Sequence, residues 1–292
     1  MIDRRQMVRL AAAAAVAGTL TPAVRAASPE RTLKAIHKRI GGRLGVHILD
    51  SQSGRRIAYD DGARYAMAST FKLMLAAALL WQVDKNAFTL EHELPISRDD
   101  LLTTSPDVEA KLKTGATSMT VRDLCAAIVV SSDNAAANIL LKGIGGPSGF
   151  TTFMRSIGDE KTRLDRTEPD LNVNLPGDPR DTTTPRAMID SMLRVFTQDV
   201  ITVRSRAVLI DWMMQSRTGL ERVRAGIPKS WQVGDKTGTG MSGAVNDLVL
   251  AWPPERRPIL IAVYMSESKL ALKDLGAAHA EIGRLVADQD WK

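Results

Sequence analysis

The chain has 292 residues, 44% of them hydrophobic and 25% charged, with a formal net charge of +6. This length and apolar content exclude a disordered or fibrous protein and allow one large domain or two coupled ones. Four arginines and one aspartate in residues 1–26 account for +3 of the charge. The remaining +3 is too small to indicate a nucleic-acid-binding protein.

Residues 1–26 have the pattern of an export signal. The pair Arg4-Arg5 precedes an alanine- and leucine-rich run at 10–20, and small residues surround 24–26 as at a cleavage site. The arginine pair predicts the twin-arginine route. An uncleaved anchor helix is the alternative, but the run is shorter than the roughly 20 residues that span a bilayer. We therefore expect a periplasmic or secreted protein with no stable membrane association after cleavage.

The next predicted elements are two short strands at 45–49 and 56–59, joined by a turn. Strand signals then vanish for a long interval. Within it, apolar residues at helical spacing predict helical stretches at 71–83, 121–141 and 185–196. The middle of the chain is therefore predicted to be all-helical.

Strands return at 232–237, 247–252 and 258–265, and a final helix is predicted at 275–287. Strands at both ends of the chain need partners. We therefore predict an α/β fold of the α+β type, with an antiparallel sheet built from both chain ends, flanked by helices. An all-helical domain is inserted, and the active site lies between the two domains. The predicted boundaries are 27–62 with 216–292 for the α/β domain and 63–215 for the all-α domain.

The cysteine and histidine content narrows the chemistry. The single cysteine, Cys125, cannot form an intrachain disulfide and lies in an apolar stretch, so we expect it to be buried. The four histidines have no metal-ligand spacing, so we expect no metal, no cofactor and no histidine-based triad. A serine hydrolase of this composition would need lysine or glutamate as its base.

A candidate nucleophile stands at the start of the helix predicted at 71–83. In Ser69-Thr70-Phe71-Lys72, the three-residue step puts Lys72 on the same helical face as Ser69, one turn away. The helix N-terminus also favours negative charge there. Alone, Ser69 could be an ordinary helix N-cap. A second Ser-x-x-Lys, at 266–269, follows a predicted strand in a polar segment and is interpreted as a chance copy.

Three further motifs accompany this pair: Ser132-Asp133-Asn134 between helical stretches, Lys236-Thr237-Gly238 on a strand, and Glu168-Pro169-Asp170-Leu171-Asn172 in a loop. Each alone could be a cap, a strand end or a surface turn. In this order the set resembles the class A serine β-lactamases, over about residues 33–286. Residues 163–181 are similar to that family's Ω-loop.

The resemblance implies that Ser69 opens the β-lactam amide of penicillins or cephalosporins through a covalent acyl-enzyme, giving antibiotic resistance. It places the oxyanion hole at the backbone N–H groups of Ser69 and Thr239. Either Lys72 or Glu168 acts as the base in acylation, and both alternatives stand. A water activated by Glu168 then hydrolyses the ester.

The resemblance also implies roles for the remaining residues. Asn172 helps Glu168 to hold the water, and Ser132, near Lys72 and Lys236, relays a proton to the ring nitrogen. The implied substrate-binding residues are Asn134 for the side-chain amide, Lys236, Thr237 and Thr239 for the carboxylate, and Gly238. Arg166 and Asp181 pair across the neck of the Ω-loop.

Arg222 is predicted to supply a cation for the substrate carboxylate, in place of the strand arginine of some relatives. The alternative is a solvated arginine in the charged run 221–224.

Two other classes share parts of this pattern. Penicillin-binding transpeptidases and carboxypeptidases use the same serine, Ser-x-Asn and Lys-Thr-Gly elements but stall at the acyl-enzyme, and the loop at 168–172 disfavours them. A β-lactam sensor would carry a membrane segment and a signalling domain, and the sequence predicts neither. We expect a monomer whose partners are small β-lactam substrates. The preferred substrate class and the response to inhibitors stay open.

Overall fold

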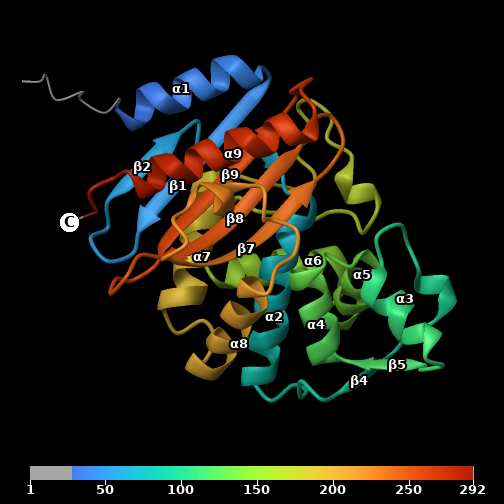
Figure 1. The fold of residues 1–292 in the computed structure, drawn as a ribbon. Helices are drawn as coiled ribbons and strands as arrows, with labels where there is room; N and C mark the ends of the chain where they lie inside the picture. Colours follow the sequence, from blue (N-terminus) through green and yellow to red (C-terminus); the bar gives the residue numbers. More distant parts are fainter. Residues whose placement is uncertain (1–27, 292) are drawn as a thin grey trace, which may run out of the picture.

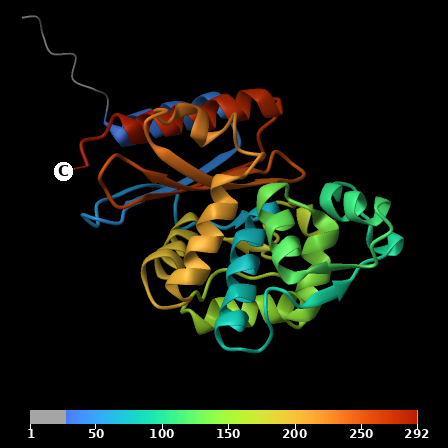
Figure 2. The same ribbon diagram turned by 60° about the horizontal axis from the view of Figure 1, so that its bottom comes forward.

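The computed structural model describes residues 28–291, so the predicted export signal lies outside the described residues. Within them, no helix has the length and apolar character needed to cross a membrane. The elements form three layers: two helices, a sheet, and a larger group of helices (Figures 1 and 2).

The central layer is a five-stranded antiparallel sheet in the order β2-β1-β9-β8-β7. Its strands are β1 (Arg43–Asp50), β2 (Arg56–Tyr59), β7 (Gln232–Thr239), β8 (Val245–Trp252) and β9 (Ile259–Ser266). All eight residues of β1 pair with β9, so the two ends of the chain share one sheet. This confirms the predicted sheet. β2 matches its prediction, β1, β7 and β8 extend one or two residues beyond theirs at one or both ends, and β9 is shifted by one residue toward the C-terminus.

The outer layer consists of α1 (Pro29–Ile40) and α9 (Leu272–Ala287), which lie side by side on one face of the sheet (Figure 1). The apolar sides of these two helices pack on this face of the sheet and form a core with it. Leu33, Val46 and Ile282 belong to this core and are fully buried. Burial of such a side chain contributes about 1.5–3 kcal/mol. The two outer helices thus stabilise the sheet on the face opposite the helical layer.

The other face of the sheet carries the remaining helices, which surround α2 (Phe71–Asp84) (Figure 2). Every residue from Phe71 to Leu80 is buried, so α2 is apolar all round and passes through the centre of the helical layer. The helices that pack on α2 are α4 (Val121–Val130), α5 (Asn134–Gly143), α6 (Gly146–Ser156) and α8 (Val203–Met214). In the same layer, α3 (Pro106–Lys113) packs on α4, and α7 (Pro185–Thr197) packs on β1 and β9.

The helical stretch predicted at 121–141 is interrupted. Ser132 has a left-handed backbone (φ 65°) that ends the continuity of α4 with α5. Asp133 then caps α5 by accepting a hydrogen bond from the Ala136 N–H at 2.9 Å. The interruption projects the Ser132 side chain from a corner between two helices.

The interval predicted to be all-helical also contains two small sheets. These are β3 (Tyr65–Ala66) with β6 (Thr182–Thr183), and β4 (Glu93–Pro95) with β5 (Ser118–Thr120). Strands of two or three residues are too short to show alternation in a sequence. Four 3₁₀ turns complete the described elements: η1 (Ala68–Thr70), η2 (Arg98–Asp100), η3 (Asp170–Asn172) and η4 (Val223–Gly226).

Candidate active site

A cavity of about 390 Å³ opens between the edge strand β7 and the helical layer. Its lining residues are Ser69, Thr104, Ser131, Ser132, Asn134, Asn172, Thr218, Arg222, Thr237 and Thr239. Seven of these ten are residues that the sequence singled out. Three more of them, Lys72, Glu168 and Lys236, lie behind the lining and are hydrogen-bonded or ion-paired to it. The predicted constellation therefore gathers at one place.

Ser69 lies in η1, immediately before α2, where a turn with left-handed Ala68 (φ 44°) leads into the helix. Strand β7 passes close to this turn at Gly238, because a Cβ there would lie 2.7 Å from the Met67 carbonyl oxygen. Glycine is thus required for β7 to approach the serine. The Ser69 hydroxyl accepts a hydrogen bond from Lys72 Nζ at 3.1 Å and donates to Glu168 Oε1 at 3.4 Å.

Lys72 is fully buried, and four oxygens lie close to its Nζ: Glu168 Oε1 at 2.9 Å, Ser132 O at 2.8 Å, Asn134 Oδ1 at 2.5 Å and Ser69 Oγ at 3.1 Å. Burial lowers the pKa of Lys72 below its ordinary value, although the Glu168 carboxylate opposes this shift. A lysine with a lowered pKa next to a serine hydroxyl can accept its proton.

The Ser132 hydroxyl lies between two lysines. It accepts a hydrogen bond from Lys236 Nζ at 3.0 Å, and Lys72 Nζ lies 3.5 Å away. Burial lowers the pKa of Lys236 well below its ordinary value, and the positive charge of Lys72 lowers it further. Ser132 can therefore exchange a proton with either side.

Glu168 is held from two directions. Its Oε2 accepts a hydrogen bond from Asn172 Nδ2 at 2.5 Å. Its backbone is clamped by Asn138, which donates to Glu168 O at 2.8 Å and accepts from Glu168 N at 3.0 Å. The sequence analysis missed Asn138. Its signal was a polar residue at i+4 from Asn134, on the same face of an otherwise apolar helix.

The neck of the loop that carries Glu168 is closed by an ion pair. Arg166 Nε lies 2.5 Å from Asp181 Oδ2, and the same carboxylate accepts from the backbone N–H groups of Asp165 and Arg166. The Asp181 side chain is almost completely buried. This arrangement fixes both ends of the segment between residues 165 and 181.

On the opposite side of the cavity, Arg222 reaches over β7. Its guanidinium donates to Thr239 Oγ1 at 2.6 Å and to the carbonyl oxygens of Gly238 and Asn246 at 2.9 and 2.5 Å. Thr239 Oγ1 accepts a hydrogen bond from Arg222, so the hydroxyl proton of Thr239 can be donated to a different acceptor. Arg222 is buried (7% exposed), which disfavours the alternative of a solvated arginine.

Thr218, which the sequence analysis also missed, lines the cavity beside Thr237. The Thr237 hydroxyl donates to Thr218 Oγ1 at 2.6 Å. Arg222 is the one charged side chain among the residues that line the cavity, so its guanidinium offers a cation to an anionic substrate. Among residues 28–291, no group of three or more His, Cys, Asp or Glu side chains could hold a metal ion.

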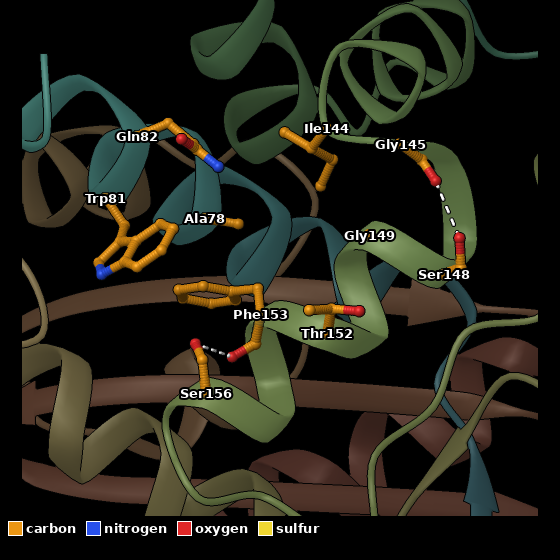
Figure 3. Close-up of a pocket in the computed structure, with 10 residues that line it drawn as sticks. All are labelled: Ala78, Trp81, Gln82, Ile144, Gly145, Ser148, Gly149, Thr152, Phe153 and Ser156. Carbon is orange, nitrogen blue, oxygen red and sulfur yellow. Dashed lines mark hydrogen bonds between the residues drawn. The ribbon is translucent and has the colours of Figure 1, made fainter. Parts of the chain in front are cut away.

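A second cavity, of about 320 Å³, lies at the far end of α2 against α6 (Figure 3). Trp81 and Phe153 form its apolar walls. The hydroxyls of Ser148 and Ser156 donate to the backbone carbonyls of Gly145 and Phe153. No lysine or carboxylate lines it, so it does not bring a serine together with a base. The predicted catalytic residues gather at the first cavity instead.

Comparison with known proteins gives consistent matches over almost the entire described chain. The model of the β-lactamase enzyme family matches residues 28–289. β-Lactamase OXY-2 of Klebsiella oxytoca is 40% identical over 256 residues, 88% of this chain and 87% of that protein. β-Lactamase CTX-M-97 of Escherichia coli is 38% identical over 284 residues, 96% and 97% of the two chains.

The solved structures agree. An ancestral (GNCA) class A β-lactamase is 48% identical with a TM-score of 0.86, covering 88% of this chain and 98% of that one. A β-lactamase from Xanthomonas campestris pv. campestris is 41% identical with a TM-score of 0.86, covering 88% and 96%.

Proposed function

The chain belongs to the β-lactamase enzyme family as a class A member, a hydrolase of β-lactams, and we propose that it acts through a covalent acyl-enzyme on Ser69. One observation carries the proposal. Ser69 Oγ lies 3.1 Å from the buried Lys72 Nζ and 3.4 Å from Glu168 Oε1, so the nucleophile has two candidate bases within reach. By opening β-lactams the enzyme confers antibiotic resistance.

In acylation, Ser69 Oγ forms a bond to the carbonyl carbon of the β-lactam ring, and its proton passes to Lys72 or, through a water, to Glu168. The developing oxyanion receives hydrogen bonds from the backbone N–H groups of Ser69 and Thr239. As the carbon–nitrogen bond breaks, Ser132 gives its proton to the ring nitrogen and is reprotonated from Lys72; in the Glu168 alternative, Glu168 passes the serine proton on to Lys72, 2.9 Å away, and is a carboxylate again. The contacts of Ser132 with both lysines support this relay.

In deacylation, Glu168 removes a proton from a water held between its carboxylate and Asn172, and the resulting hydroxide attacks the ester carbonyl. The Ser69–carbon bond then breaks, and the proton returns to the serine. The short contact between Asn172 and Glu168, together with the clamp by Asn138, supports a fixed carboxylate at this place.

The substrate is oriented at its two ends. Asn134 holds the side-chain amide, while Lys236, Thr237 and Thr239 meet the carboxylate beside the ring, with Gly238 letting the strand approach. The Arg222 guanidinium in the cavity lining, bonded to Thr239, supports a carboxylate at this end. Arg166 and Asp181 act at a distance, because they hold the Ω-loop that presents Glu168.

Residues 1–26 are proposed to direct export by the twin-arginine route, and the mature protein is proposed to act as a monomer in the periplasm or outside the cell. The arginine pair and the short apolar run support the export proposal. No cofactor and no partner other than the β-lactam substrate is required by the proposed mechanism.

The test of the function is steady-state turnover of a chromogenic cephalosporin by the purified mature protein. We expect each enzyme molecule to hydrolyse many cephalosporin molecules, so that product continues to form well beyond one equivalent of enzyme. A single burst of one equivalent followed by silence would instead identify a transpeptidase-like or sensor-like protein that stalls at the acyl-enzyme.

Arg222→Ala is expected to lower kcat/KM by about tenfold or more. An exposed ion pair contributes only about 0–1 kcal/mol, whereas a hydrogen-bonded charge in a partly closed site contributes roughly 1.5–3 kcal/mol, and 1.4 kcal/mol corresponds to tenfold. The measurement is kcat/KM on one penicillin and one cephalosporin, with the melting temperature of each variant.

Arg217→Ala is the matched control, because it removes a positive charge from an exposed position in the same segment. Its kinetics should equal those of the wild type. If Arg222→Ala also leaves kinetics and melting temperature unchanged, the carboxylate site consists of Lys236 and the threonines alone.

A further inference from the structure

One residue of the cavity wall is a serine whose hydroxyl is bonded to a carboxylate behind it. Ser131 follows the last residue of α4 and lines the cavity. Its hydroxyl contacts Asp107 Oδ2 and lies 2.9 Å from Ala127 O. A hydroxyl has a single proton, and an ionised carboxylate is a stronger acceptor than a backbone carbonyl. The Ser131 oxygen therefore gives its proton to Asp107 and can offer only lone pairs to a molecule in the cavity.

Asp107 is held in place by the Ser-Asp-Asn motif. It is the second residue of α3, and its backbone N–H donates to Asp133 Oδ2 at 2.9 Å. The Val108 N–H donates to the same oxygen at 3.1 Å, and Asp133 is fully buried. Because these bonds use the backbone of Asp107, they remain when its side chain is changed.

The segment that leads into α3 is fixed at the same place. The Asn134 N–H donates to Thr104 O at 2.9 Å, and Asn134 Nδ2 donates to Thr103 O at 2.8 Å. Thr104 lines the cavity beside Ser131 and Asn134. We call Thr104, Ser131 and Asp107 the acidic corner. Its position is set by backbone hydrogen bonds to the catalytic motif.

The acidic corner adds a negative charge to a cavity whose lining has only the positive charge of Arg222. Asp107 is half-buried and lies one hydrogen bond behind the lining. On the same helix, Glu109 forms an ion pair with Lys113 at 2.8 Å. Within residues 28–291, the carboxylate of Asp107 has the Ser131 hydroxyl as its partner and no cation. Its charge is therefore available to a cation that enters the cavity.

Two buried lysines lie near the corner, but both are weakened as positive charges. Lys72 and Lys236 contact the hydroxyl of Ser132, the residue after Ser131. Lys72 is ion-paired with Glu168 at 2.9 Å, and burial lowers the pKa of both lysines. Asp107 is thus the group that sets the sign of the charge at this edge of the cavity.

The substituent at C3 of a cephalosporin is the part of the substrate that has no partner in the proposed mechanism. Seven of the ten lining residues have a proposed role, and the three that remain are Thr104, Ser131 and Thr218. C3 is bonded to the carbon that carries the carboxylate, and that carbon is bonded to the ring nitrogen at Ser132. The C7 side chain leaves the ring system at its opposite end. The C3 substituent is therefore placed beside Ser131.

We propose that Asp107 is a specificity-determining residue that favours β-lactams with a positively charged C3 substituent, an inference that rests on the proposed function. Such a substrate offers its carboxylate to Arg222 and its cation to the acidic corner. The lone pairs of Ser131 make the contact, and the Asp107 carboxylate supplies the charge. Because the attraction is electrostatic and partly exposed to solvent, salt weakens it.

The test compares the wild type with Asp107→Asn on two cephalosporins that share one C7 side chain. One carries a pyridiniummethyl group at C3 and the other an uncharged acetoxymethyl group. Asparagine keeps the shape of aspartate and removes its charge. At low salt we expect the substitution to lower the pyridinium-to-acetoxy ratio of kcat/KM by about two- to fivefold, the effect of one partly exposed charge pair. In about 1 M salt, where the Debye length is about 3 Å, the two ratios should become equal.

Glu109→Gln is the matched control, because it removes a negative charge from an exposed position on the same helix. Its ratio should equal that of the wild type. A second readout needs no turnover. In a Ser69→Ala background, which cannot form the acyl-enzyme, calorimetry gives the Kd of each cephalosporin, and Asp107→Asn should weaken binding of the pyridinium compound relative to the acetoxy compound by a similar factor.

A lower melting temperature of Asp107→Asn with unchanged ratios would mean that the carboxylate only stabilises the N-terminus of α3, and would overturn the inference. A change of ratio that persists in high salt would overturn it as well, because it would come from altered shape rather than charge. If the wild type hydrolyses neither cephalosporin, the proposed function fails, whereas the ratio of Kd values still decides whether the acidic corner prefers the cation.

Discussion

Ser69→Ala is expected to abolish acylation and to lower kcat by about 10⁶-fold, as removal of the nucleophile does in another serine hydrolase. The substitution removes the oxygen that lies 3.1 Å from Lys72 Nζ and 3.4 Å from Glu168 Oε1 at the cavity wall. The fold should remain intact, because the Ser69 side chain is only half-buried and caps no helix. After exposure to a slowly hydrolysed β-lactam, mass spectrometry should show an adduct on the wild type alone.

Ser266→Ala is the control for this measurement. It removes the serine of the second Ser-x-x-Lys pattern, whose hydroxyl is bonded to Asn174, and the adduct should persist. An adduct on Ser266, or one that survives Ser69→Ala, would show that the nucleophile is not Ser69.

Glu168→Ala is expected to let the acyl-enzyme accumulate, with deacylation slowed by about 10²- to 10⁴-fold, as for loss of one catalytic base. Glu168 lies on the Ω-loop, outside the elements shared with transpeptidases, and its carboxylate is held by Asn172 at 2.5 Å. The measurement is the rate of acyl-enzyme formation and decay by stopped flow and mass spectrometry. Deacylation at the wild-type rate would place the activation of water elsewhere.

The same variant separates the two candidate bases for acylation. If acylation keeps its rate in Glu168→Ala, Lys72 accepts the serine proton, and if it slows in parallel with deacylation, Glu168 does. Glu168 lies 2.9 Å from Lys72 Nζ and opposes the lowering of the lysine pKa, so its removal should lower that pKa further. Glu168→Gln, which preserves shape and removes charge, controls for the loss of packing at this fully buried side chain.

The parts of the site that the sequence predicts are those carried by short segments. Ser69 with Lys72, or Lys236 with Thr237 and Gly238, are neighbours on one helix or strand, and their spacing follows from local geometry. The single sheet was predictable as well, because apolar strands at both chain ends need partners. The division at residues 62/63 and 215/216 into two domains stays a prediction.

The missed residues act across long separations. Asn138 clamps the backbone of a residue 30 positions away, and Thr218 meets Thr237 across 19. Asparagine in an apolar helix and threonine in a loop both occur commonly without a functional role. The local sequence around Asn138 and Thr218 therefore does not identify their hydrogen-bond partners. Asn174 and Ser266 are 92 positions apart, and only tertiary structure brings them together.

Four helices also escaped prediction, α1, α3, α6 and α8. Residues 145–149, which begin α6 and include the residue before it, contain three glycines and a proline. That composition predicts a turn rather than a helix. The paired residues of β3 and β6 are 116 and 118 positions apart in the chain. A local sequence pattern cannot predict such a pairing. Tertiary packing, rather than propensity, decides these segments.

The place of β9 in the sheet bears on the order in which the protein can mature. β9 lies between β1 and β8, so the strand that joins the two halves of the sheet is the last one to leave the ribosome. Until it arrives, β1 and β2 have an open edge, and pairing them with β9 must close a loop of about 200 residues. The complete sheet can therefore form only after almost the entire chain has been synthesised, and until then the edge of β1 is open to other pairings.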